Sequence, residues 1–197
     1  MNPDVTTYRL PQDAGIVLVP LARAAIAREL GEPYPMPEEH SWLNERGASF
    51  ITLMHETKLR GCIGTLEAHR ALGEDVKANA VAAAFRDPRF KPLTASEFRS
   101  VEVEISLLSP LEPLEFADES EALSQLRPGI DGVVFRYGYH KSTFLPQVWR
   151  DFGNAADFLA HLKYKAGLPP DFWDPEVKLA RYTVIKWRES ELRASKP

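Results

Sequence analysis

The clearest alternation of apolar and polar residues along the chain lies in residues 101–108, which read VEVEISLL. Side chains of a strand alternate between two faces, so the odd-numbered positions would form an apolar face while Glu102 and Glu104 point the opposite way. One apolar and one solvated face are typical of an antiparallel sheet. This segment therefore predicts a strand in a sheet with one side open to water.

Further strands are predicted on either side of this segment. Residues 48–54 and 59–66 would form a hairpin closed by the intervening HETK. Residues 129–146 would form two strands around a turn at 138–141, and residues 182–187 a closing strand. Turn-like residues separate each of these runs from the next, which favours strands joined by short connections.

Helical spacing and helix-end signals predict helices at residues 13–30, 74–85, 119–126 and 154–166. The sequence TASE at 94–97 is a capping box that would open one short helical turn. Helices and strands intermix without the regular alternation of a parallel fold, so the predicted fold class is α+β.

The region of residues 109–119 contains Pro110 and Pro113, which mark a linker. We place a lobe boundary there. The chain has 197 residues, 44% of them hydrophobic and 26% charged, which suits a globular protein that buries a core without disulfides or metals.

Charge and cysteine content narrow the function classes. The net charge is −4, so the molecule as a whole has no electrostatic attraction to nucleic acid. We therefore do not expect nucleic acid as a partner. The single cysteine excludes an intramolecular disulfide and fits a reducing compartment. The first 13 residues lack the pattern of a signal peptide, and charges interrupt the most apolar early run. We therefore expect a cytoplasmic protein outside any membrane.

The segment LRGCIG at residues 59–64 sets the only cysteine, Cys62, between two glycines. In a strand, Arg60, Cys62 and Gly64 would share one face. A guanidinium beside the sulfur would favour the reactive thiolate. Gly64 would leave open space next to the sulfur, and Gly61 would let another segment approach from behind. The alternative is a buried structural cysteine that behaves as a small hydrophobic residue.

Two neighbouring segments offer partners for this thiol. His69, in the loop that follows the strand, is the candidate general base. The sequence FRDPRFKP carries Arg86 and Arg89 around Asp87, and arginines can clamp a small anionic substrate through a carboxylate or phosphate. The alternative for this segment is a loop that ends a helix, with Asp87 paired to an arginine.

Known cofactor and metal motifs do not occur in the sequence. It contains no Walker loop, no Gly-x-Gly-x-x-Gly, no second cysteine and no His-x-x-x-His. We therefore expect neither a cofactor nor a metal held by the chain's own residues.

At LRGCIGTLEAHR the sequence resembles the AMMECR family, whose signature hexapeptide it matches without a change. The resemblance extends from about residue 18 to residue 189 and includes AFRDPRFKPL, VEVEISLLSPLEPL, GIDGVVF, TFLPQVW and FLAHLKYKAGL. It implies a single AMMECR-type domain over residues 1–197, built as two lobes on mainly antiparallel sheets flanked by helices. It also implies partners, because similar proteins are one component of a set with a Memo-like protein and a radical-SAM enzyme.

Three hypotheses for the function are open, and the resemblance supplies no catalytic mechanism to decide among them. The first is an enzyme or substrate-binding component that uses Cys62, with Arg60, His69 or the Arg86–Arg89 segment acting on a small anionic substrate. The second is a non-catalytic interaction subunit in which the LRGCIG strand is structural. A third, RNA binding, would need a basic patch that the charge does not indicate.

Overall fold

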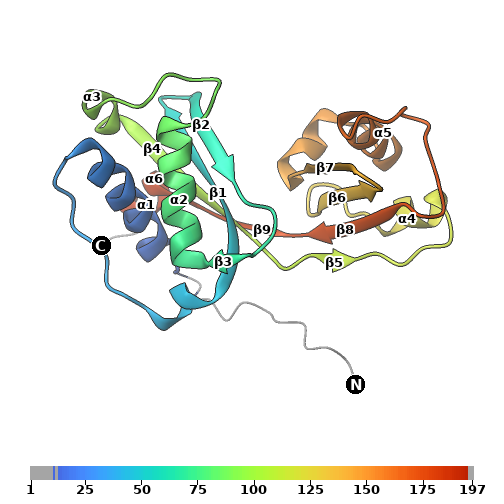
Figure 1. The fold of residues 1–197 in the computed structure, drawn as a ribbon, viewed down its shortest axis with the longest axis horizontal. Coiled ribbons are helices and arrows are strands. Elements are labelled where there is room, and N and C mark those ends of the chain that lie inside the picture. The colour runs from blue at the N-terminus through green and yellow to red at the C-terminus, as the bar shows by residue number, and fades with distance from the viewer. Residues whose placement is uncertain (1–10, 12, 195–197) are drawn as a thin grey trace. The chain divides into compact units, whose positions relative to one another are not determined.

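The structure is a computed structural model that describes residue 11 and residues 13–194. It divides into two compact units, unit 1 (Met1–Leu108 with Ile185–Pro197) and unit 2 (Ser109–Val184). Each unit combines helices with antiparallel strand pairs (Figure 1), which confirms the α+β class. The expectation of no signal peptide rests on the first 13 residues, of which residues 1–10 and 12 lie outside the described residues.

Unit 1 is built on a sheet of five strands, of which four follow the order β2-β1-β4-β9 while β3 pairs with β1. Their bounds are β1 Arg46–His55, β2 Lys58–Gly64, β3 Arg70–Ala71, β4 Val101–Leu108 and β9 Val184–Arg188. β1 pairs antiparallel with β2, β3 and β4. The predicted hairpin is therefore present, and its second strand, β2, lies at an edge of the sheet.

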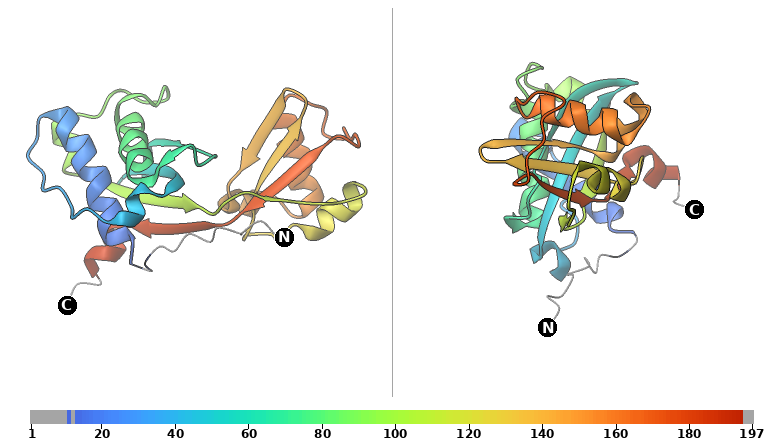
Figure 2. Two further views of the ribbon diagram at one scale, coloured as in Figure 1. Left: turned by 60° about the horizontal axis from the view of Figure 1, so that its bottom comes forward. Right: turned by 90° about the vertical axis from the view of Figure 1, so that its right-hand side faces the viewer.

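Two long helices of unit 1 pack against each other and against one face of this sheet (Figure 2). The helical segments of the unit are α1 Gly15–Leu30, α2 Leu72–Phe85, α3 Ala95–Phe98, α6 Glu189–Ala194 and the 3-10 turn η1 Ser41–Asn44. The capping box predicted at 94–97 is formed at the start of α3.

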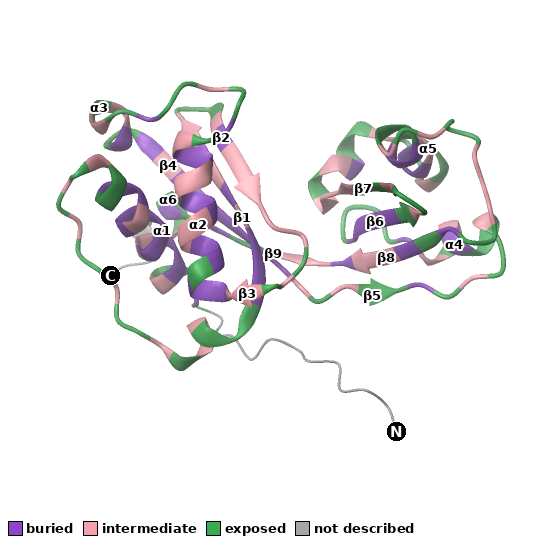
Figure 3. Ribbon diagram, viewed as in Figure 1, coloured by how far each residue is buried: buried purple, intermediate pink, exposed green. Residues whose placement is uncertain are grey.

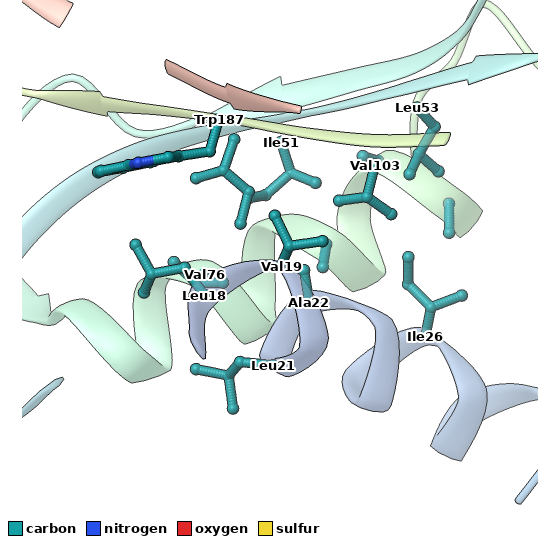
Figure 4. Packing of buried hydrophobic residues seen from close by; sticks show 14 of the residues in the cluster. Leu18, Val19, Leu21, Ala22, Ile26, Ile51, Leu53, Val76, Val103 and Trp187 are labelled. Atoms are coloured by element: carbon teal, nitrogen blue, oxygen red, sulfur yellow. The ribbon is translucent and has the colours of Figure 1, made fainter. Parts of the chain in front are cut away.

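The core of unit 1 lies between these helices and the sheet. Leu18 of α1 and Val76 of α2 are fully buried with Ile51 of β1 and Val103 of β4, and Trp187 of β9 closes one side (Figure 4). Because successive side chains of a strand alternate, the neighbours of these core residues point to the opposite face of the sheet. We call that opposite face, which neither α1 nor α2 covers, the outer face.

Unit 2 has a sheet of four strands in the order β5-β8-β6-β7. Its elements are β5 Glu112–Pro113, β6 Gly132–Tyr137, β7 His140–Phe144, β8 Lys178–Tyr182, α4 Glu119–Gln125, α5 Ala155–Lys165 and the 3-10 turn η2 Pro146–Asp151. A separate core fills this unit, in which the rings of Trp149 and Phe158 stack 3.7 Å apart. In Figure 3 its buried residues concentrate along β6 and the inner side of α5.

The closing strand expected at 182–187 is wrong in one respect, because this region contains the end of β8 and most of β9, which belong to different sheets. Tyr182 and Trp187 are both buried, although they are five positions apart and belong to different sheets. Thr183 lies between the two strands and exchanges hydrogen bonds with Ser109. The chain leaves unit 2 at this point, which a single run of apolar residues does not reveal.

Candidate functional site

Gly61 allows helix α2 to approach strand β2 closely. It pairs with Leu53 and faces the core, and a Cβ built on it would lie 2.2 Å from the backbone carbonyl oxygen of Ala83 in α2. The expectation that another segment approaches behind Gly61 is confirmed. The same contact leaves no room for a ligand on this side, so Gly61 contributes packing and not a substrate contact.

Gly61→Ala is expected to destabilise unit 1 by about 1–3 kcal/mol, because a backbone carbonyl cannot turn away from the new methyl group as a side chain could. Urea unfolding measures the loss. Gly153→Ala is the matched control, since nothing lies within 4 Å of its Cβ position, and we expect it to change stability by less than about 0.5 kcal/mol. Equal effects of the two substitutions would contradict the packing role of Gly61.

Gly64 does not leave open space beside the sulfur, which corrects the expectation from the sequence. It pairs with Phe50, and a Cβ on Gly64 would lie 2.1 Å from the Cγ atom of the Phe50 ring. The ring therefore covers the glycine across the strand pair. A ligand at the thiol would meet this ring and not a gap.

Arg60 does not share a face with Cys62 in the manner expected. The register shifts between Leu53 and Met54, so Arg60 is an extra residue at a β-bulge and the period-two argument fails there. Its guanidinium pairs with Glu97 of α3 through Nε–Oε1 at 2.9 Å and Nη2–Oε2 at 3.2 Å. The Arg60 hydrogen bond is the largest influence that lowers the pKa of Glu97, to about 2. The ion pair between Arg60 and Glu97 thus links α3 to the edge strand β2.

The Cys62 thiol has a different partner, Thr52. Cys62 and Thr52 lie directly opposite each other in the β1–β2 pair, and the Thr52 hydroxyl donates a hydrogen bond to Sγ at 3.3 Å. Cys62 is partly exposed and lies on the outer face, away from the core residues. The alternative of a fully buried structural cysteine is therefore not what the structure shows.

The polar row continues from Thr52 to Glu104 of β4, which lies directly opposite Thr52. Glu104 pairs with Lys186 at 2.8 Å and with Arg188 at 2.7 Å, both on β9. Burial alone would raise the pKa of Glu104, but the hydrogen bonds from these two cations outweigh it and hold the pKa below its ordinary value. The outer face thus carries a thiol, a hydroxyl, an ionised carboxylate and two cations in sequence across four strands.

The backbone of Cys62 is held by Asp87 and Arg89 from the loop after α2. The Asp87 carboxylate accepts the Cys62 N–H at 2.9 Å, and the Arg89 guanidinium donates to the Cys62 carbonyl at 3.3 Å. Arg89 also binds Asp87 through Nε at 2.9 Å and Nη2 at 2.7 Å. The pair therefore occupies the backbone groups that an edge strand would otherwise present to another chain.

Arg89 is the guanidinium that contacts Cys62, through the backbone carbonyl oxygen. The hydrogen bond to Asp87 raises the pKa of Arg89. The Arg89 side chain is 54% exposed, so one side of it is open to solvent. The alternative interpretation of FRDPRFKP, a loop in which Asp87 pairs with an arginine, therefore agrees with the structure. The arginine of this pair is Arg89, which also contacts the backbone of Cys62.

Asp87→Asn should remove part of the acid sensitivity of unit 1. The hydrogen bond from Arg89 holds the pKa of Asp87 well below its ordinary value of 3.8. A lowered pKa stabilises the fold at pH values above about 4, and this stabilisation is lost as the pH falls further. Urea midpoints at pH 7 and pH 3 should therefore differ more in the wild type than in the variant. Parallel pH profiles would contradict this assignment.

The structure does not bring His69 and Arg86 to the thiol. His69 is exposed, with Nδ1 2.9 Å from the carbonyl oxygen of Glu67, and no hydrogen bond within the described part of the chain joins it to Cys62. Arg86 caps the end of α2 and its side chain is exposed. No hydrogen bond among the described residues joins either side chain to Cys62, and their roles as base and clamp stay predictions.

Sequence reasoning missed a buried polar cluster just after the hexapeptide. Asp75 of α2 is fully buried and accepts hydrogen bonds from the backbone and hydroxyl of Ser49, from Thr65, from Arg70 and from Asn79, at 2.7–2.9 Å. The usable signal is the spacing of Asp75 and Asn79, four residues apart on the alanine-rich side of a packed helix.

Neither a metal site nor a membrane-spanning helix is found among the described residues. Across residues 11 and 13–194, no three or more His, Cys, Asp or Glu side chains are arranged to bind a metal ion. In the same part of the chain, every helix is too short or too polar to cross a bilayer.

Comparisons with known proteins agree over nearly the whole chain. The AMMECR1 family model matches residues 19–187. A protein of Methanothermobacter thermautotrophicus is 38% identical over 188 residues, covering 91% of this chain and 96% of that one. A protein of Methanocaldococcus jannaschii is 38% identical over 189 residues, covering 93% and 94%. The crystal structure of an uncharacterized Pyrococcus horikoshii protein superposes with a TM-score of 0.80 at 34% identity, covering 91% and 93%. The chain therefore belongs to the AMMECR1 family.

Proposed function

We propose that this protein is a small-molecule-binding or enzymatic component whose site is the Cys62 thiol on the outer face of unit 1. The observation that carries the proposal is that Cys62 is partly exposed and its sulfur accepts a hydrogen bond from Thr52. The two glycines of the hexapeptide have packing contacts that account for them, and Arg60 pairs with Glu97. Packing leaves three features of the segment unexplained: the thiol, the exposed Leu59 and the buried Nη1 atom of Arg60, which has no hydrogen-bond partner.

The surroundings of the thiol favour an anionic ligand. The Thr52 hydroxyl donates towards the sulfur, and the exposed Arg89 guanidinium stands beside the same residue. A carboxylate or phosphate of a small substrate can bind Arg89 while the rest of the substrate lies at the sulfur. Arg89 thus takes the place of Arg60 as the nearby cation, and Thr52 takes the place of His69 as the hydrogen-bonding partner of the sulfur.

The resemblance suggests where such a component acts. Similar proteins belong to a set with a Memo-like protein and a radical-SAM enzyme, so we propose these two as partners. A cytoplasmic location, where thiols stay reduced, suits a free Cys62.

A ligand experiment tests the proposal. The native protein is incubated with a small-metabolite extract, separated from free metabolites, and examined by native mass spectrometry. We expect an added mass on the wild type that is lost in Cys62→Ser and reduced in Arg89→Gln. Retention of the same mass by Cys62→Ser would place the ligand elsewhere and overturn the proposal.

A second candidate is a non-catalytic interaction subunit, and the packing of Gly61 against Ala83 favours it. In this case the hexapeptide forms a rigid edge strand and the partner binds a surface that the strand supports. Pull-down of a Memo-like or radical-SAM partner by Cys62→Ser, at wild-type strength and with no ligand detected on the wild type, would support this alternative.

A further inference from the structure

A hollow of about 520 Å³ lies in unit 1 between the first half of α1 and the loop that follows this helix. From α1 and the residues before it, the lining includes Asp13, Ile16, Val17 and Pro20. This volume falls within the range of cavities that hold ligands or the side chains of a partner. We call this hollow the α1 groove.

The α1 groove exposes apolar surface on both sides. Ile16 is 53% exposed on the helix, and Met36 is 65% exposed on the opposite side. Pro35 and Pro37 flank Met36 and also line the hollow. Isolated exposed apolar residues need no explanation, but exposed apolar residues that line one hollow together are typical of an interaction surface.

Helix α1 carries this surface in addition to its core face. Leu18 and Ala22 are fully buried against the sheet. Ile16 and Pro20, four residues apart, share a face of the helix and both line the groove. A helix that is apolar on more than one side is normally covered on more than one side. The sheet and α2 cover the buried sides of α1, and Ile16 stays exposed on the side of the groove.

The charge at the groove indicates the chemistry of that partner. Two acidic residues, Asp13 and Glu38, line the groove together with His40. No lysine or arginine is among the described residues that line it. Asp13 and Glu38 are both exposed, so their carboxylates are available to a cationic group. A groove lined by apolar residues and two exposed carboxylates is complementary to an apolar stripe flanked by basic residues.

We propose that the α1 groove docks an amphipathic helix of a partner protein, with leucine-like side chains between Ile16 and Met36 and lysine or arginine side chains against Asp13 and Glu38. This site goes beyond the function proposed for Cys62. Because α1 packs on the face of the sheet opposite the outer face, the docking site and the thiol lie on different sides of unit 1.

Fluorescence anisotropy with model peptides tests the docking site. One labelled peptide of about 15 residues, a length at which isolated helices are marginal in water, has leucines at helical spacing and lysines elsewhere. The matched peptide has glutamate in place of each lysine. We expect the lysine peptide to bind the wild type at least about tenfold more tightly than the glutamate peptide, and its affinity to fall as salt is added.

Surface variants locate the binding. The double variant Ile16→Ser, Met36→Ser is expected to weaken binding of the lysine peptide by about tenfold or more, because both apolar contacts are lost. Tyr164→Ser with Ile185→Ser is the matched control, since these residues are 70% and 55% exposed elsewhere, and should leave the affinity within about twofold. Cys62→Ser should also leave it unchanged, which separates this test from that of the thiol.

Three outcomes would overturn the docking site. One is equal binding of the two peptides. Another is equal weakening by the groove variant and the control variant. The third is a wild-type dimer in sedimentation that Ile16→Ser with Met36→Ser converts to monomer, because a second copy of this chain would then be the occupant.

Discussion

Asp75→Ala is expected to destabilise unit 1 by about 3–5 kcal/mol, the usual cost of removing one member of a buried charged network. Asp75 is fully buried, and its carboxylate accepts five hydrogen bonds from four residues. Alanine would leave the Ser49 N–H and the Asn79 amide without this acceptor in a place that water does not reach. Arg70 loses less, since its side chain is 33% exposed and can turn to solvent.

Urea unfolding measures this loss, and the adjacent acid provides its control. The Glu74 side chain is 67% exposed and pairs only with Lys77 in the next turn among the ion pairs of the described residues. Glu74→Ala should therefore change stability by less than about 0.5 kcal/mol. A loss below about 1 kcal/mol for Asp75→Ala would show that the network contributes little and would contradict its assigned role.

Arg23→Leu should have a comparable effect, about 3–5 kcal/mol, because it leaves a buried carboxylate without its cation. Arg23 is 5% exposed and Glu189 is 7% exposed. The guanidinium bonds Glu189 through Nε at 3.1 Å and Nη2 at 2.5 Å, and it also donates to the carbonyl oxygens of Phe98 and Val101. One side chain thus joins α1, the end of α3, β4 and α6.

The double variant Arg23→Leu, Glu189→Leu separates the ion pair from the packing around it. Replacing both charges by apolar residues is often much less costly than leaving one charge alone. We therefore expect the double variant to recover at least about 1 kcal/mol of the loss in urea unfolding. A double variant less stable than Arg23→Leu would contradict the account of a stranded carboxylate.

Local patterns were enough to predict much of the fold. The alternating segment 101–108 forms β4 with the predicted bounds. The predicted water-exposed face is wrong for this strand, because Glu104, Ser106 and Leu108 on the outer face are buried. The helix predicted at 154–166 is α5, and its Asn154 cap accepts a hydrogen bond from the Asp157 N–H. The two-residue strands β3 and β5 were missed, since two residues carry no periodicity. The division of 182–187 between two sheets depends on long-range pairing that no local pattern encodes.

The candidate site was predictable only in part. The glycines around Cys62 did indicate close packing, and at Gly61 this is what the structure shows. The choice of Arg60 as the activating group failed because a β-bulge breaks the alternation at that residue. Thr52 was not found because it lies on the neighbouring strand, ten residues from Cys62. Which residue stands opposite another depends on strand register, and register is set by the whole sheet.

The most direct test of the account is the rate of iodoacetamide alkylation of Cys62, compared between the native protein and the urea-unfolded protein at pH 7. Cys62 is the only cysteine, so the signal has a single source. A partly exposed thiol beside Thr52 and Arg89 should react in the native state within about tenfold of the unfolded rate, or faster. Thr52→Val should slow the native reaction severalfold. Modification that begins only when the protein unfolds would contradict the claim that Cys62 is the functional group of the outer face.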